Sequence, residues 1–164
     1  MPLLCLCSLS ISTLFAQQFS YPPDAVLAAF NAEHLLVKTS SWSAYEPSIY
    51  RAEYTLFGDT RIYIAKYDRL GNAVEKQTQI DYTQLPLKAK AEIAEYFKNY
   101  YPAMCMQLMR TGETPGYKVT VEKWSLGHLF KQRYKVVLSA EGELLERSEV
   151  ELDLPELASP PQSF

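Results

Sequence analysis

The chain has 164 residues, of which 48% are hydrophobic and 13% aromatic, and its formal net charge is −3. This composition is typical of a globular protein, and the length suits one ordinary domain or two small units that share a core. Lysines and arginines are scattered along the chain; Lys131, Arg133 and Lys135, for example, alternate along one expected strand, as on a solvated face. Because nucleic-acid binding needs clustered cations, the charge pattern excludes that class of partner.

Residues 1–16 are uncharged and rich in leucine. Such a run is too short to span a bilayer and resembles the apolar core of a secretory signal peptide, with Ala16 as the small residue before the cleavage site. The usual basic segment before this core is missing, so a buried N-terminal strand is the alternative. Cleavage would remove Cys5 and Cys7 and leave Cys105 alone, which excludes an intramolecular disulfide. We therefore predict a periplasmic or secreted protein whose mature chain has no integral membrane segment.

The first predicted unit spans residues 21–80. Pro23 and Asp24 favour a helix start, because proline is tolerated in the first turn and an acidic residue there complements the helix dipole. The helix is expected to end near Glu33. Beyond it, apolar and polar residues alternate with a period of two, which predicts strands. The expected strands are residues 35–45, 49–57, 61–68 and 73–80.

The second predicted unit spans residues 85–151. An apolar stripe at helical spacing predicts a helix over residues 85–101, which Pro102 is expected to end. Four strands should follow, at residues 104–109, 117–124, 129–138 and 144–151. Residues 152–164 contain three prolines without periodicity and are expected to form a disordered tail.

The two units show the same order of elements. Pro23 aligns with Pro86 and Gly71 with Gly142, while the loops between them differ in length. An internal duplication explains this pattern. We therefore predict an α+β fold built as a tandem duplication of a helix packed on a mostly antiparallel four-stranded sheet.

These features carry a family resemblance over roughly residues 21–151. The proline-led helix, the tyrosine-bearing strand, the aromatic strand ending in Tyr67-Asp68-Arg69-Leu70-Gly71 and the second helix at Leu85-Pro86 resemble the PepSY-like family. That family is also described as β-lactamase-inhibitor-protein-like and comprises secreted proteins common in Bacteroidetes. The resemblance implies a helix on an antiparallel sheet, a periplasmic or extracellular location, and binding rather than catalysis. It supplies no catalytic residues, and its inhibitory label is an analogy of fold.

Side chains suited to catalysis or metal binding are sparse. The only two histidines are His34, at the expected end of a helix, and His128, beside a turn. Neither belongs to a motif with metal-ligand spacing. Cys105 lies in an apolar run, where cysteine is usually buried. We therefore predict no catalytic, cofactor-binding or metal-binding residues and a protein that is not an enzyme.

The remaining candidates for function are large apolar residues on the sheet face opposite the helices. These are Ile62, Ile64, Trp124 and Val137. Exposed together they would form a protein-binding patch; alternatively, the two units pack against each other there. Our leading hypothesis is a secreted or periplasmic binding module, inhibitory or regulatory toward an envelope or extracellular protein. The alternatives are a carrier of a small apolar or envelope-derived ligand and a hydrolase that uses His128.

Overall fold

The computed structural model describes residues 21–125 and 130–150. Within these ranges it contains two α-helices, one short 3-10 helix and eight strands. In chain order the elements are α1 (Asp24–Glu33), β1 (Val37–Glu46), β2 (Ile49–Leu56), β3 (Tyr63–Asp68), β4 (Ala73–Ile80), η1 (Tyr82–Gln84), α2 (Leu87–Tyr96), β5 (Tyr101–Arg110), β6 (Gly116–Ser125), β7 (Phe130–Leu138) and β8 (Leu144–Glu149).

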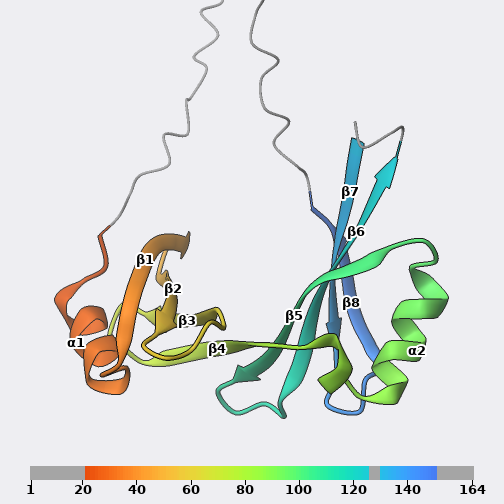
Figure 1. Cartoon of the computed structure of the whole chain (residues 1–164). Helices are drawn as coiled ribbons and strands as arrows, with labels where there is room; N and C mark the ends of the chain where they lie inside the picture. The colour runs from red at the N-terminus through yellow and green to blue at the C-terminus, as the bar shows by residue number, and fades with distance from the viewer. Residues whose placement is uncertain (1–20, 126–129, 151–164) are drawn as a thin grey trace, which may run out of the picture.

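All eight strands form one antiparallel sheet in the order β1 to β8 (Figure 1). The predicted fold of two four-stranded sheets is therefore wrong, although the chain is α+β as expected. The two halves join because β4 pairs with β5, from Glu75 opposite Arg110 to Ile80 opposite Cys105. The sequence did not predict this pairing, because alternation along a strand indicates which side chains share a face but not which other strand pairs with its edge.

Both helices lie on the same face of this sheet, at its two outer flanks (Figure 1). Helix α1 packs over β1–β4, in a core of Val26, Phe30, Tyr50, Ala52, Tyr54, Ala65 and Tyr67. Helix α2 packs over β5–β8, in a core of Leu85, Ala89, Ile93, Phe97, Cys105, Val119, Val121, Val136 and Leu138. Neither helix has the length and apolar character needed to cross a membrane, and the same holds for every helix in the described ranges.

Both helices start where the sequence predicts, whereas α2 ends earlier than predicted. Pro23 and Pro86 are the N-cap residues of α1 and α2. Helix α2 ends at Tyr96, five residues earlier than predicted, and Pro102 lies inside β5. Phe97 is the C-cap residue, and the turn that follows contains Asn99 in a left-handed conformation, with φ of 69°; asparagine tolerates this conformation better than most residues.

Two turn glycines let the sheet approach the helices closely. Gly71 precedes β4 and Gly142 precedes β8, and both have a positive φ. A Cβ atom on Gly71 would lie 2.7 Å from the carbonyl oxygen of Ala25 in α1, and one on Gly142 would lie 2.4 Å from the backbone nitrogen of Ala89 in α2. Only glycine fits both the conformation and the space at these two positions.

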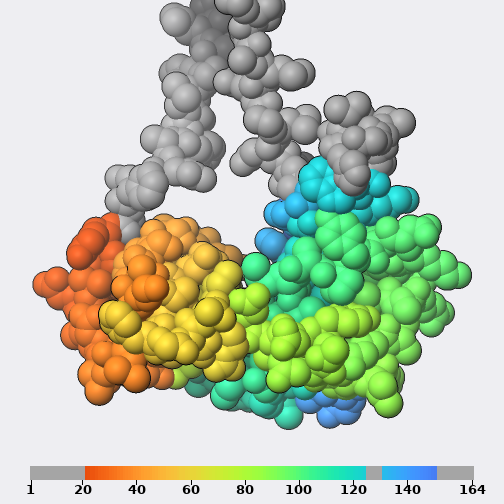
Figure 2. Space-filling view, viewed as in Figure 1, coloured from red at the N-terminus to blue at the C-terminus, as the bar shows by residue number. Residues whose placement is uncertain are grey.

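The face that the helices leave uncovered is here called the open face. Ile64, Met106 and Leu108 on this face are buried although no helix covers them, so we infer that the sheet curls toward it. In the space-filling view the halves appear as two adjoining lobes (Figure 2).

Candidate protein-binding face

Several open-face side chains are buried although no helix covers them. Ile64 is 7% exposed, Met106 2% and Leu108 5%. Strand register explains the arrangement, since Ile64 lies opposite Gln77, Gln77 opposite Leu108, and Met106 opposite Lys118. In the curled sheet these side chains are covered by their neighbours on adjacent strands.

The centre of the open face contains a buried ion-pair network. Lys66 Nζ lies 2.8 Å from Glu75 Oε1, and Arg110 Nε lies 3.0 Å from Glu75 Oε2. Gln77 Nε2 donates to Glu75 Oε1 at 2.6 Å, and Lys66 Nζ sits 3.6 Å from the centre of the Tyr45 ring. Burial by itself would raise the pKa of the Glu75 carboxyl, but the hydrogen bonds from Lys66 and Arg110 outweigh it and lower the pKa.

One acceptor in this network has no partner. Gln77 is 2% exposed, and its Oε1 is buried without a hydrogen bond in the described structure. Exchanging the amide oxygen and nitrogen would not help, because the oxygen would then face the Glu75 carboxylate. A buried acceptor left unpaired costs free energy, roughly 1–3 kcal/mol.

Two lysines beside the network have no counter-ion. Lys118 is half-buried and Lys135 is exposed, and neither forms an ion pair with any residue that the structure describes. Burial lowers the pKa of the Lys118 ammonium, and the positive charges of Lys135 and Lys66 lower it further, against the opposing effect of Glu75. Glu75 is thus shared by Lys66 and Arg110, and Lys118 and Lys135 are the cations of this region without an ion-pair partner in the described structure.

A second charged cluster lies near the far end of β6. The Glu122 carboxylate is 5% exposed and pairs with Lys131 at 2.7 Å and Arg133 at 2.5 Å. The Tyr101 hydroxyl donates to Glu122 Oε2 at 3.1 Å and accepts a hydrogen bond from the Trp124 indole. The expectation of a simply solvated row of cations on β7 is thus wrong for Lys131 and Arg133, because a buried carboxylate holds both.

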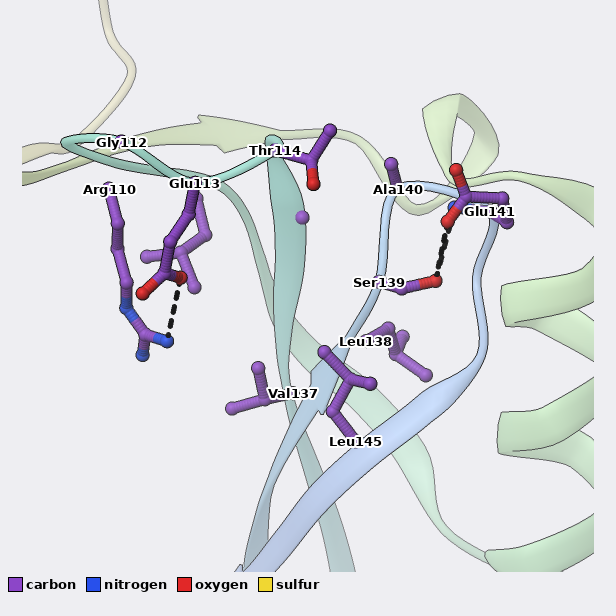
Figure 3. Close-up of a pocket in the computed structure, with 12 residues that line it drawn as sticks. Arg110, Gly112, Glu113, Thr114, Val137, Leu138, Ser139, Ala140, Glu141 and Leu145 are labelled. Carbon is purple, nitrogen blue, oxygen red and sulfur yellow. Dashed lines mark hydrogen bonds and ion pairs between the residues drawn. The ribbon is translucent and has the colours of Figure 1, made fainter.

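A pocket of about 280 Å³ opens at the turn end of the second half (Figure 3). Leu108, Val137 and Leu145 supply its apolar side chains. Arg110 and Glu113 lie on one side of it, joined by an ion pair of 3.5 Å. An apolar floor with a polar rim is the usual anatomy of a site that receives a partner's side chain.

The structure places the four predicted site residues on the open face but does not bring them together. Val137 lines the pocket described above, and Trp124 is 41% exposed beside Tyr101. The two are separated by six residues along β6, roughly 20 Å, since Val137 lies opposite Lys118. Ile64 is buried rather than exposed, and Ile62 lines a separate shallow hollow on the first half.

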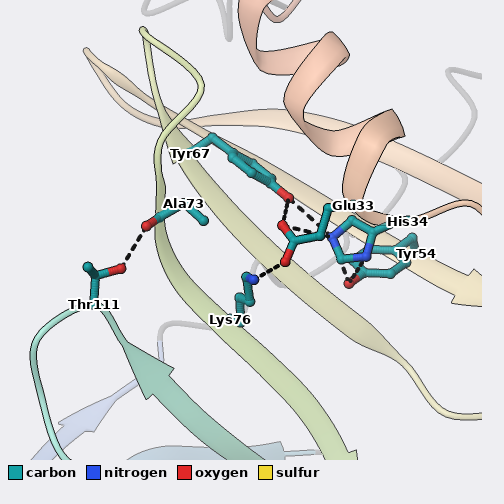
Figure 4. Close-up of polar contacts among 7 residues, drawn as sticks. All are labelled: Glu33, His34, Tyr54, Tyr67, Ala73, Lys76 and Thr111. Atoms are coloured by element: carbon teal, nitrogen blue, oxygen red, sulfur yellow. Dashed lines mark hydrogen bonds and ion pairs between the residues drawn. The ribbon is translucent and has the colours of Figure 1, made fainter.

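Polar contacts give His34 a structural role (Figure 4). His34 Nε2 lies 3.1 Å from the Tyr67 hydroxyl, which donates to Glu33 Oε2, and Glu33 Oε1 pairs with Lys76. The Tyr54 hydroxyl lies 3.3 Å from both ring nitrogens of His34. A neutral imidazole fits these contacts, with Nε2–H donating to Tyr67 and Nδ1 accepting from Tyr54. Burial, more than any other effect, lowers the pKa of His34.

The other groups considered for chemistry are structural or cannot be placed. Cys105 is a buried core thiol whose pKa burial raises to about 11. His128 lies outside the described residues. Within the described ranges no three metal-ligating side chains cluster.

Sequence reasoning missed the charged centre of the open face. Lys66 and Glu75 lie opposite each other on β3 and β4, on the same face as the neighbouring pair Ile64 and Gln77. The alternation along each strand predicts this arrangement only once the two strands are known to pair. The burial of Lys118 could not be inferred from β6 alone, because it depends on the curl of the sheet.

Comparisons with known proteins identify the fold. No family model matches the chain, and no curated protein matches it. A proposed periplasmic protein from Bacteroides eggerthii matches with a TM-score of 0.64 at 17% identity, over 79% of this chain and 90% of that one. A BLIP-like protein from Bacteroides fragilis matches with a TM-score of 0.59 at 19% identity, over 81% and 89% of the two chains. A DUF2874 family protein from Bacteroides ovatus matches with a TM-score of 0.64 at 15% identity, over 86% and 96%.

These similarities are similarities of fold, because the sequence identities are low. They support the BLIP-like part of the predicted resemblance, whereas none of these three solved structures is described as PepSY-like. The chain therefore has the fold of these Bacteroides proteins, one of which is BLIP-like.

Proposed function

We propose that this protein is a non-enzymatic binding module that docks a protein partner on the open face. The observation that carries the proposal is the chemistry of that face. Buried charges are expensive unless they are paired and hydrogen-bonded. On the open face Lys66 and Glu75 are buried and paired with each other, while Lys118 is half-buried without an ion-pair partner in the described structure. Apolar side chains would pack this face at least as well, so we infer that its charges serve recognition of a polar partner.

The location of the charges also favours binding over support of the fold. Each helix covers the opposite face, where the two apolar cores lie. The open face instead combines an apolar pocket floor, charged groups and a partly exposed tryptophan, Trp124. Tryptophan and arginine are enriched at the centres of protein–protein interfaces.

The comparisons support the cellular setting and the class of activity. The Bacteroides eggerthii neighbour is described as periplasmic, which agrees with the periplasmic or secreted location predicted from the sequence. The Bacteroides fragilis neighbour is BLIP-like. On that basis we propose that binding inhibits or regulates an envelope or extracellular protein.

Affinity capture from the native periplasm tests this function. The tagged chain should recover one protein in stoichiometric amount, and Leu145→Glu at the pocket should abolish recovery. Leu70→Glu is the matched control, because Leu145 and Leu70 are both well exposed and Leu70 lies in the β3–β4 turn. Equal recovery by both variants, or native mass spectrometry showing a co-purified small molecule with no protein partner, would reject the proposal in favour of another surface or a carrier.

A further inference from the structure

We propose that the open face recognises an acidic loop of the protein partner, whose carboxylates bind between Lys118 and Lys135. This inference rests on the proposed function and specifies the chemistry of the partner. It draws on the ion pairs of the open face, on the strand register and on the apolar pocket beside the two lysines.

Charge balance distinguishes these two lysines from the other cations of the face. Arg51 pairs with Glu53 at 2.6 Å, and Lys66 and Arg110 share Glu75. Lys131 and Arg133 share Glu122. Lys118 and Lys135 have no such carboxylate in the described structure, and they repel each other. A bound carboxylate would remove that repulsion and provide the missing counter-charge.

The strand register places the two lysines next to each other. Lys118 lies opposite Val137 on β7 and opposite Met106 on β5, and Lys135 lies opposite Thr120 on β6, so the two lysines are diagonal neighbours on the open face. The curl brings Lys118 within electrostatic reach of Lys66 and Glu75 as well. A single carboxylate there would interact with several cations in partly desolvated surroundings, where ion pairing is stronger than in water.

The apolar surroundings of the two lysines favour a peptide loop over a simple anion. Phosphate or a free carboxylate brings charge alone, whereas a peptide can place an apolar group beside its acidic side chains. The pocket next to this region, lined by Leu108, Val137 and Leu145, offers apolar contact to the same loop.

The test uses the full chain and a short synthetic peptide of alternating glycine and glutamate, measured by calorimetry at low salt. The matched peptide carries glutamine in place of glutamate, and inorganic phosphate is the small-anion probe. We expect the glutamate peptide to bind and the other two not to bind. Lys118→Gln should weaken binding about tenfold, the effect of losing one charge-assisted hydrogen bond. Lys98→Gln should leave it unchanged, because Lys98 is an exposed lysine just beyond α2, away from the open face.

Three results would overturn the inference: phosphate binds as tightly as the glutamate peptide, Lys118→Gln and Lys98→Gln weaken peptide binding equally, or the glutamate peptide does not bind. Lys135→Gln provides a second variant at an exposed position, where the change cannot disturb the core. Capture of the native partner separates the two proposals: if Lys118→Glu still recovers the partner and Leu145→Glu does not, the open face is the binding site but an acidic loop is not its ligand.

Discussion

Lys66 and Glu75 form an ion pair of 2.8 Å on the side of the sheet that no helix covers, and each residue is only 8% exposed. The pair bridges β3 and β4 near the middle of the eight-stranded sheet. Such a pair contributes little net stability by comparison with apolar side chains, but breaking it is costly. The stability of the free protein should therefore respond strongly to changes at this position.

Removing one partner of the pair should destabilise the fold. Glu75→Leu leaves the Lys66 ammonium buried without its carboxylate, so the free energy of unfolding should fall by about 3–5 kcal/mol. The double variant Lys66→Met/Glu75→Leu should recover part of this loss, since neither charge is then buried, while the Gln77 amide lacks its acceptor in both variants. Urea denaturation of the four proteins in a double-mutant cycle measures the coupling. A loss below about 1 kcal/mol in Glu75→Leu would show that water reaches Lys66.

Stability should also depend on pH through His34. Burial lowers the pKa of His34 below its value of 6.5 in the unfolded chain. As pH falls below 6.5, the unfolded state therefore takes up more protons than the folded state, and folding stability decreases. Protonation also removes Nδ1 as the acceptor near the Tyr54 hydroxyl. Urea midpoints measured on either side of pH 6.5 check the prediction.

His34→Gln is the control for that measurement. The variant lacks the imidazole, so the decrease in stability just below pH 6.5 should be smaller than in the original chain. His128 and all other titrating groups are common to both proteins, which isolates the contribution of His34. Identical pH profiles would mean that His34 is hydrated in solution and does not sense pH.

The contact between Gly142 and α2 should tolerate no side chain. Gly142→Ala places a Cβ against the Ala89 backbone in a left-handed conformation that by itself costs about 1–2 kcal/mol. Overpacking should add about 1–3 kcal/mol. Gly112→Ala is the matched control, because Gly112 also has a positive φ but has open space around it. If both variants unfold at the same denaturant concentration, α2 moves away from the turn at little cost.

Lys118 should lower the stability of the free protein, because its ammonium is half-buried among like charges. Lys118→Met should therefore raise the free energy of unfolding by about 0.5–2 kcal/mol. Gains of this size are common when a residue kept for function is replaced. The same variant should bind the glutamate peptide more weakly. Thermal melts at low salt, where repulsion is least screened, provide the readout. A destabilised Lys118→Met would instead assign Lys118 a structural role in covering Met106.

The sequence indicated most elements, because the patterns that form them are local. Alternation in residues 49–56 and the prolines at 23 and 86 act through neighbours in the chain. The single sheet was missed, since pairing of β4 with β5 joins residues that flank a whole helix. For the proposed site, the alternation predicted only the face: Val137 and Trp124 lie on the side of the sheet opposite the helices, and their role in binding stays a prediction. The charged centre of this face escaped notice, because the environment of Lys118 arises from strands β2 to β7 acting together.

Site-specific photo-crosslinking in living cells tests most directly whether the open face binds the partner. A photoreactive side chain replaces Leu145 on the open face in one variant and Leu87 on α2 in the other; both positions are strongly exposed. We predict a protein adduct of defined mass from position 145 and none from position 87. An adduct from position 87 alone would contradict the account, because the partner would then bind the helical side of the sheet.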